Sequence, residues 1–212
     1  MVDDLKSRGY LSSPDVERAL LKVPRELFVP EDQRAYAYED RPLPIGHGQT
    51  ISAPSVVARM TELLDVKKGN KVLEVGTGSG YQAAILAWLV GDEGHVWTVE
   101  RVPELATRAR VAIETAGLGP RVTVVVGDGS LGYPPAAPYD RIIVTAAAPR
   151  VPNSLLDQLT VGGKIVIPVG IRTSQILHVI VKKGQRSYDV KLDLEVLFVP
   201  LVGAEGWPED KS

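Results

Sequence analysis

The sequence has no cysteine among its 212 residues, and it has only two methionines, two phenylalanines and two asparagines. The lack of cysteine excludes disulfide bonds, thiolate metal sites, iron–sulfur clusters and a cysteine nucleophile. The scarcity of labile residues, together with 16 prolines, is typical of heat-stable proteins. The remaining composition, 44% hydrophobic and 24% charged, is that of an ordinary globular protein with a sizeable core.

An excess of one charge is also missing. Lysine and arginine number 24 and aspartate and glutamate 26, so the formal net charge is −2. A protein that binds the phosphate groups of nucleic acid usually has many more basic than acidic residues. We therefore expect no nucleic acid among its partners.

Long apolar runs and targeting signals are absent as well. The first ten residues, MVDDLKSRGY, are acidic and polar, unlike a signal peptide. The longest apolar run, residues 83–90, is far shorter than the ~18 residues that suggest a membrane span. These features predict a soluble, cytoplasmic protein with no membrane partner.

The length predicts one compact unit, since ~150 residues are typical of a domain, and the patterning divides it into two parts. Residues 1–54 are expected to form a helical extension and a loop. Ser13 and Pro14 suit the start of a short amphipathic helix. Residues 39–54 are dense in proline and glycine, and a loop of that length without periodicity is usually functional or disordered. Residues 55–212 form the second part.

Strands and helices alternate in the second part. Short apolar runs predict strands at 71–75, 95–100, 122–126, 139–145 and 164–169. Helical spacing predicts helices at 55–64, 81–90, 103–116 and 151–159. Two later runs, 176–182 and 194–201, are expected to form an antiparallel edge. The fold class is therefore α/β, a doubly wound and mostly parallel sheet of about seven strands.

Three segments follow the first three strands of this sheet. They are the turn at residues 74–80 (EVGTGSG), Glu100, and the pair Asp128 and Gly129. Ligands of doubly wound sheets bind beyond the carboxyl ends of the strands, where these segments would meet. Glycines let a ligand approach the backbone, Glu100 can accept hydrogen bonds from ribose hydroxyls, and Asp128 can accept one from an exocyclic amine. Each alone could be an ordinary turn or strand end, but together they predict an adenine nucleoside site.

The spacing of the glycines favours one cofactor. Dinucleotide-binding turns read G-x-G-x-x-G, and Tyr81 stands at the position of their third glycine. The pattern here is G-x-G-x-G, with Glu74 two residues before it. It is similar to the first motif of S-adenosylmethionine-dependent methyltransferases. We therefore expect S-adenosylmethionine rather than NAD.

Residue types and motifs that the sequence lacks also exclude some kinds of methyl acceptor. Methylation of pyrimidine C5 generally needs a cysteine, and methylation of exocyclic amines typically follows a [DN]-P-P-[YFW] motif, where residues 145–149 read TAAAP. The histidines, His47, His95 and His178, are scattered and suggest no metal site. A carboxylate needs no strong base, because its ionised form can attack a sulfonium methyl directly in a dry, well-aligned site.

The segment at residues 48–54 (GQTISAP) resembles the signature loop of the protein-L-isoaspartate (D-aspartate) O-methyltransferase family. The resemblance continues through LEVGTGSGYQAA, VERVPEL, VVGDGSLGYPPAAPYDRIIVTAAAP, LLDQLTVGGKIVIPVG and LFVPLVGAEGW, from about Asp15 to Trp207. The QTISAP and VTAAAP segments are specific to the family, whereas the glycine-rich turn is shared by methyltransferases. The resemblance implies a Rossmann-like methyltransferase core in residues 55–212, with substrate-binding strands at its C-terminal end.

The resemblance further implies a protein-repair enzyme. Such an enzyme transfers the methyl group of S-adenosyl-L-methionine, without a metal, and releases S-adenosyl-L-homocysteine. Its substrates are damaged proteins and peptides, in which it methylates the free α-carboxylate of L-isoaspartyl and D-aspartyl residues. The ester then collapses to a succinimide, which reopens partly to normal aspartyl. A monomer is expected.

The resemblance also implies roles for individual residues. Ser52 would be the active-site residue, which holds and orients the substrate carboxylate rather than attacking it. Gln49, Thr50 and Ile51 would close over cofactor and substrate. The expected cofactor contacts are Gly76, Gly78, Gly80, Glu100 for the ribose, and Asp128 and Gly129 for the adenine. The expected peptide contacts are Ser52, Val199, Pro200 and Leu201.

The residues themselves leave alternatives open. Ser52 could be the N-cap of the helix expected at 55–64, with Ile51 and Val56 forming a hydrophobic staple. Val199–Leu201 could be a plain edge strand in which proline limits aggregation. Other functions that fit are a methyltransferase acting on RNA or a small molecule, a non-catalytic nucleoside-binding module, and an NAD enzyme.

Overall fold

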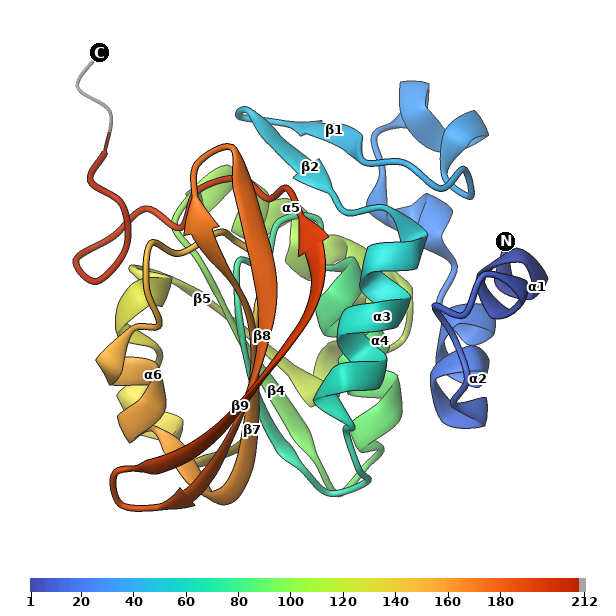
Figure 1. Cartoon of the computed structure of the whole chain (residues 1–212). Helices are drawn as coiled ribbons and strands as arrows, with labels where there is room; N and C mark the ends of the chain where they lie inside the picture. Colours follow the sequence, from blue (N-terminus) through green and yellow to red (C-terminus); the bar gives the residue numbers. More distant parts are fainter. Residues whose placement is uncertain (210–212) are drawn as a thin grey trace.

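The structure, a computed structural model, describes residues 1–209 and is built around a seven-stranded sheet (Figure 1). The strand order is β5-β4-β3-β6-β7-β8-β9. The strands are β3 (Lys71–Val75), β4 (His95–Glu100), β5 (Val122–Val126), β6 (Tyr139–Val144), β7 (Leu159–Ile171), β8 (Ser174–Gly184) and β9 (Ser187–Val196). The first five are parallel, and β8 and β9 join antiparallel at one edge. The predicted fold class is confirmed.

Successive residues of the central strands enter two different cores. On β3, Val72 packs into the core on one face of the sheet and Leu73 into the core on the other. On β6, Ile143 and Ile142 divide in the same way, and all four side chains are fully buried. Strands covered on both faces bury successive residues in two cores, which explains why most of their positions are apolar; Glu74 on β3 and Thr98 on β4 are buried polar exceptions.

Helices cover both faces of the sheet (Figure 1). α3 (Pro54–Leu64), α4 (Tyr81–Val90) and α5 (Pro103–Thr115) lie on one face and share the larger core. The short α6 (Asn153–Asp157) lies on the other face, where it contacts the 3₁₀ helix η4 (Gly129–Leu131). The 3₁₀ helix η3 (Gly119–Arg121) follows α5 and contacts it, and η5 (Pro134–Ala136) precedes β6. α6 ends earlier than its sequence pattern predicts, because β7 already begins at Leu159. Within residues 1–209, no helix is long and apolar enough to cross a lipid bilayer.

The N-terminal segment packs against the larger core. It consists of α1 (Val2–Ser7), α2 (Pro14–Lys22), η1 (Arg25–Phe28) and η2 (Glu31–Tyr36). α2 begins as predicted, since Ser13 is its N-cap and the Ser13 hydroxyl accepts a hydrogen bond from the Val16 amide. The division of the chain at residue 54 stays a prediction, because the apolar side chains of the segment and of the core form one cluster.

Residues 39–54 are not an irregular loop, and the sequence expectation is wrong in this respect. They contain a two-stranded hairpin of β1 (Leu43–Gly46) and β2 (Gln49–Ile51), which stands over the carboxyl end of the sheet (Figure 1). Its two-residue tip, His47 and Gly48, has φ of 52° and 68°, as the central residues of a type I′ turn require. The two strands have only four and three residues, so an alternation of apolar and polar side chains cannot be recognised in this proline-rich stretch.

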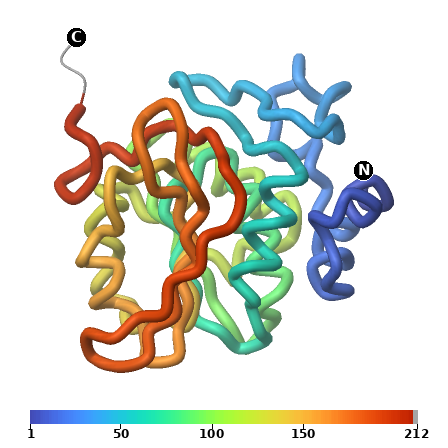
Figure 2. Tube along the Cα trace, viewed as in Figure 1, coloured from blue at the N-terminus to red at the C-terminus, as the bar shows by residue number. Residues whose placement is uncertain are grey.

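The last strand also differs from the prediction of 194–201. β9 runs from Ser187 to Val196, and from Leu197 onward the chain leaves the edge of the sheet. It crosses to the carboxyl end of β6, where Pro200 forms a parallel bridge with Ala147. Figure 2 shows this red segment passing over the upper end of the molecule.

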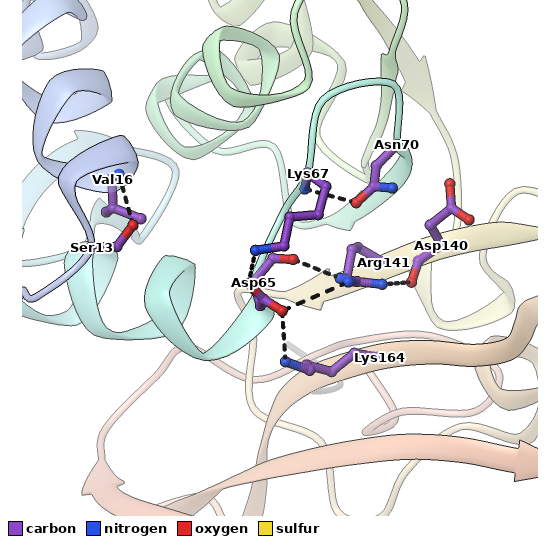
Figure 3. A network of polar contacts seen from close by, with 8 residues as sticks. All are labelled: Ser13, Val16, Asp65, Lys67, Asn70, Asp140, Arg141 and Lys164. Carbon is purple, nitrogen blue, oxygen red and sulfur yellow. Dashed lines mark hydrogen bonds and ion pairs between the residues drawn. The ribbon is translucent and has the colours of Figure 1, made fainter.

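A polar cluster ties the end of α3 to the amino ends of the strands (Figure 3). Asp65 follows α3 with a left-handed φ of 56°, and its carboxylate pairs with Lys67 and, at 3.8 Å, with Lys164 on β7. Arg141 on β6 donates from Nε to the Asp65 carbonyl at 3.0 Å and lies 4.0 Å from its carboxylate. Three cations therefore surround one carboxylate at the end opposite to the hairpin.

Candidate functional site

A pocket that is partly open to solvent lies at the carboxyl ends of β3, β4 and β6. The turn after β3 forms its floor, residues 49–52 form its roof, and residues 199–202 form a further wall. The lining residues are Gln49, Thr50, Ile51, Ser52, Val56, Val57, Met60, Glu74, Val75, Gly76, Thr77, Gly78, Ser79, Tyr81, Gln82, Val99, Glu100, Arg101, Gly129, Thr145, Ala146, Val199, Pro200, Leu201 and Val202. Strand ends far apart in sequence therefore meet here, as the doubly wound topology predicts.

The glycine turn on the floor is shaped by its neighbours in the fold. Gly76 has φ of 98°, and a Cβ on it would lie 2.5 Å from the Thr145 hydroxyl. That hydroxyl donates to the Gly76 carbonyl at 2.6 Å. The close approach of the chain after β6 to the turn after β3 thus requires glycine at this position, and Gly76 and Gly78 both line the pocket.

Glu100 is held at the end of β4 by two backbone amides. Its side chain is 6% exposed, and its carboxylate accepts from the Gly78 amide at 2.8 Å and from the Val102 amide at 3.0 Å. Each carboxylate oxygen has a second lone pair free to accept a bond. The result is a rigid pair of acceptors in the pocket wall, which matches the two hydroxyls of a ribose.

Glu74 is the carboxylate that our sequence reasoning left without a role. It is fully buried and lines the pocket. Its Oε2 accepts from the Thr98 hydroxyl, whereas Oε1 has no partner among the described residues. Burial raises the pKa of Glu74 to about 8, against the opposing effect of the Thr98 bond. An unpaired, buried carboxylate oxygen favours a positively charged ligand group.

Gly80 does not line the pocket. It is the N-cap of α4, with φ of 88°, and a Cβ on it would approach Ala109 and Ile113 of α5 to 3.1 Å. The absence of a side chain at Gly80 allows the close packing of α4 and α5, and the expected contact of Gly80 to the cofactor stays a prediction.

Asp128 also lies outside the lining residues, although its neighbour Gly129 is among them. The Asp128 carboxylate accepts from the amide and hydroxyl of Ser130, at 2.9 and 2.6 Å, and from the Ala204 amide at 2.8 Å. The Asp128 carboxylate therefore anchors the C-terminal segment at Ala204. The expected contact of Asp128 to adenine stays a prediction. Gly129 is needed because a Cβ there would lie 2.5 Å from Val75.

The roof carries Ser52, which is not the N-cap of α3. Ala53 occupies that position, and the Ser55 amide donates a hydrogen bond to the Asp40 carboxylate at 2.8 Å. Among residues 1–209 the Ser52 hydroxyl has no hydrogen-bond partner, while its carbonyl accepts from Arg25 at 2.7 Å. The capping alternative is therefore wrong, and the hydroxyl is available to a ligand.

The C-terminal wall is not an edge strand of the sheet. The Ala147 amide donates to the Val199 carbonyl at 2.7 Å, and the Leu201 amide donates to the Ala147 carbonyl at 2.8 Å. The same carbonyl accepts from the indole nitrogen of Trp207 at 3.1 Å. These bonds anchor Val199, Pro200 and Leu201 beside the pocket, together with Val202, which the sequence patterns do not assign.

Comparisons with known proteins decide the family. The family model described as Protein-L-isoaspartate(D-aspartate) O-methyltransferase matches residues 1–206. The chain belongs to this family. It is 59% identical to the protein-L-isoaspartate O-methyltransferase of Hyperthermus butylicus, over 99% of this chain and 90% of that protein. It is 58% identical to the one from Ignicoccus hospitalis, over 97% of each.

A solved structure of a protein-L-isoaspartate O-methyltransferase from Plasmodium falciparum, in complex with S-adenosyl-L-homocysteine, is also similar to this chain. The TM-score is 0.84 with 28% sequence identity, and the match covers 95% of this chain and 96% of that one. The resemblance to this methyltransferase family, which the QTISAP and VTAAAP segments indicated, is thus confirmed, and it extends over nearly the whole chain.

The pocket of this family member fits a cationic nucleoside such as S-adenosylmethionine. Glu100 supplies paired acceptors, and Glu74 supplies an unpaired carboxylate oxygen. No group of three or more histidines, aspartates or glutamates that could hold a metal ion occurs among residues 1–209. Glu74 could have been identified from the sequence, because it precedes the glycine turn, and Thr145 likewise belongs to the VTAAAP segment, whereas the sequence assigned no role to Val202.

Proposed function

We propose that this chain transfers the methyl group of S-adenosyl-L-methionine to the free α-carboxylate of L-isoaspartyl residues, and of D-aspartyl residues, in damaged proteins and peptides. Its membership of the family supports the reaction class. The observation that carries the proposal is that the family-specific loop, with the unpartnered Ser52 hydroxyl, roofs a pocket built for a nucleoside. Substrate carboxylate and cofactor would meet at that roof.

Residues of the strand ends and the roof would hold the cofactor. We assign the ribose to Glu100, and a positively charged group to Glu74. The backbone of Gly76, Gly78 and Gly129 would form the close contacts. Gln49, Thr50 and Ile51 would cover the cofactor from above, since they belong to the same pocket lining.

The substrate would bind between the roof and the C-terminal wall. Ser52 donates its hydroxyl hydrogen to one oxygen of the substrate carboxylate, which orients the other oxygen. Val199, Pro200 and Leu201 present an extended backbone to the peptide, a mode that tolerates many neighbouring side chains. The substrate need only contain the damaged residue in an accessible stretch of chain.

Methyl transfer to a carboxylate requires that the carboxylate and the methyl group are aligned and that water is excluded, but it requires no base. When bound, S-adenosylmethionine supplies a methyl group on a positively charged sulfur. An ionised carboxylate is already a nucleophile, so no residue has to remove a proton. Charge is lost as an anion and a cation combine, and a site without water favours that change. The roof residues exclude water, and Ser52 fixes the attacking oxygen at reacting distance, ~3–3.5 Å from the methyl carbon.

Methyl-labelled S-adenosylmethionine tests this proposal. The purified protein is incubated with an isoaspartyl peptide and, in parallel, with its aspartyl isomer and its D-aspartyl isomer. We expect label in the isoaspartyl peptide, less in the D-aspartyl peptide and none in the aspartyl control, released as methanol by mild base. Equal labelling of the isoaspartyl and aspartyl peptides, or labelling of neither, would overturn the proposal.

We further infer that the enzyme works as a cytoplasmic monomer and binds no nucleic acid. The near-neutral charge of the chain supports the last point. Light scattering of the purified protein, alone and with transfer RNA, checks both the mass and the expected lack of a complex.

A further inference from the structure

Arg25 has an unusual position for an arginine, because its side chain is completely buried. It lies in η1 and connects three separate segments of the chain. Its Nε donates to the Ala37 carbonyl at 2.6 Å, and its Nη2 donates to the Ser52 carbonyl at 2.7 Å. The guanidinium carbon also lies 4.9 Å from the centre of the Tyr81 ring, within the range of a cation–π interaction.

This arrangement is unfavourable for the fold taken by itself. Arginine stays charged in proteins, and a buried cation without a carboxylate partner is strongly destabilising compared with an apolar side chain. Among residues 1–209 no carboxylate lies within ion-pair distance of the guanidinium, and its Nη1 has no hydrogen-bond partner. Burial lowers the pKa of Arg25, and the more distant Asp40 carboxylate only partly offsets this effect. The benefit of the arginine must therefore come from what it holds.

Two of its three contacts belong to the pocket. Ser52 and Tyr81 both line it, whereas Arg25 does not. The bond to the Ser52 carbonyl fixes the peptide plane between Ser52 and Ala53, and so the direction of the Ser52 side chain. Three residues further along the chain, the Ser55 amide donates to the Asp40 carboxylate at 2.8 Å. Arg25 thus holds the roof, and Asp40 holds the first turn of α3 directly after it.

We propose that Arg25 is a positioning residue, which orients Ser52 toward the substrate carboxylate by holding its backbone carbonyl. This inference rests on the proposed methyl transfer to a carboxylate, but the rigidity of the roof is a separate property. Without the guanidinium, the Ser52 carbonyl loses its partner and the roof segment gains freedom. Small displacements of a positioning group reduce turnover strongly, while the cofactor contacts on the strand ends remain.

The test compares Arg25→Met and Arg25→Lys with the control Arg59→Met. Arg59 forms a bidentate pair with Asp193 that joins α3 to β9, so its loss destabilises the fold without touching the roof. Hydrogen exchange of residues 49–55 measures the rigidity of the roof without substrate. In Arg25→Met we expect exchange there to speed up about tenfold, with β3 and α5 unchanged, and in Arg59→Met we expect no such local change.

Kinetics supply the second measurement. In Arg25→Met we expect kcat/KM for the isoaspartyl peptide to fall about 30-fold, while the Kd of S-adenosylhomocysteine changes less than about fivefold. Arg25→Lys, whose ammonium can still reach one carbonyl, should recover part of both the exchange protection and the turnover. It also serves as the readout if Arg25→Met does not fold.

Unchanged exchange of residues 49–55 in both Arg25 variants would overturn the positioning role. So would a loss of turnover that Arg59→Met reproduces at equal stability. If the wild-type protein methylates no isoaspartyl peptide, the proposed function fails, but the exchange measurement still decides whether Arg25 holds the roof.

Discussion

At the scale of single residues, Glu74 has the most altered chemistry in the pocket. Burial raises its pKa from the usual 4.5 to about 8, so the folded protein binds this proton more tightly than the unfolded chain. The stabilisation is complete below pH 4.5 and is lost as the pH rises through about 8. A cationic ligand beside Glu74 would favour the ionised form instead.

Glu74→Gln is therefore expected to flatten the pH dependence of stability. The amide keeps the shape and can accept the Thr98 bond, but it does not titrate. Denaturant unfolding at a series of pH values should show the wild type losing stability relative to the variant as the pH approaches 8, by about 1–3 kcal/mol. Parallel curves for the two proteins would mean that Glu74 is ionised at neutral pH or makes contacts with solvent.

Ser52→Ala is expected to separate turnover from both stability and cofactor affinity. The Ser52 hydroxyl has no partner in the described residues and caps no helix, so its removal should leave the melting temperature unchanged. Turnover on an isoaspartyl peptide should fall by ~10–100-fold, because the substrate carboxylate loses its orienting donor. Calorimetry with S-adenosylhomocysteine should show an unchanged Kd. Unaltered kcat would remove Ser52 from the active site.

Glu100→Ala is expected to weaken cofactor binding and to leave turnover at saturating cofactor nearly unchanged. Two amides and a ligand diol lose their acceptor, so the binding of S-adenosylhomocysteine should weaken by about 1–3 kcal/mol. At saturating cofactor, kcat should remain close to the wild-type value. Calorimetry checks the first point, and an affinity equal to the wild type would show that the ribose does not lie at Glu100.

At the scale of elements, Gly80 allows two helices, α4 and α5, to pack closely. Gly80→Ala should destabilise the fold without changing cofactor affinity. The positive φ alone is unfavourable by ~1–2 kcal/mol, and the close approach of α5 adds to it. Gly117 offers a matched control, since it also has positive φ, 73°, but no atoms within 4 Å of its Cβ position.

Gly117→Ala should therefore show the φ effect alone, and the difference between the two variants gives the packing contribution. Chemical denaturation measures both, and calorimetry with S-adenosylhomocysteine measures the affinity. A weakened affinity in Gly80→Ala at unchanged stability would return Gly80 to the cofactor site.

The elements of the parallel core could be predicted because their signals are local. The helices at 81–90 and 103–115 and the strands at 71–75, 95–100 and 122–126 agree with their apolar patterns to within a residue. The hairpin of β1 and β2 could not, because its stability comes from packing of Leu43, Ile45 and Ile51 on distant residues. The end of β9 was equally hidden, since residues 197–201 are as apolar as a strand but pair with Ala147 instead.

The site divides in the same manner. Gly76, Gly78, Glu100 and the roof loop carry motifs and line the pocket. Thr145 and Tyr81 lie in recognised segments, but their meeting in the pocket depends on the packing of segments that are distant in sequence. The same is true of the bond from Arg25 to the roof, and no single motif encodes either.

At the scale of the whole molecule, opposite ends of the sheet have different tasks. The carboxyl ends of the strands hold the pocket, and the amino ends are joined by the cluster around Asp65 (Figure 3). Burial alone would raise the pKa of Asp65, but Lys67, Lys164 and Arg141 together lower it below its usual range. The stabilisation is therefore present above pH 3.8 and is lost as the pH falls below it.

Asp65→Asn isolates this electrostatic effect, because asparagine tolerates the left-handed φ as well as aspartate does. Since the carboxylate is half exposed, we expect a loss of only about 0.5–1 kcal/mol at neutral pH. The loss should shrink at high salt and vanish in acid, while methyl transfer is unchanged. Thermal unfolding at several salt concentrations and pH values checks this, and a salt-independent loss would point to packing instead.

The most direct test of the central claim, that cofactor and carboxylate meet beneath the 49–52 roof, is a crystal structure with S-adenosylhomocysteine and an isoaspartyl peptide bound together. We predict that the ribose hydroxyls lie within hydrogen-bond distance of the Glu100 carboxylate, and that the free α-carboxylate of the peptide accepts a bond from the Ser52 hydroxyl. A nucleoside bound away from β3 and β4, or a peptide carboxylate remote from Ser52, would contradict it.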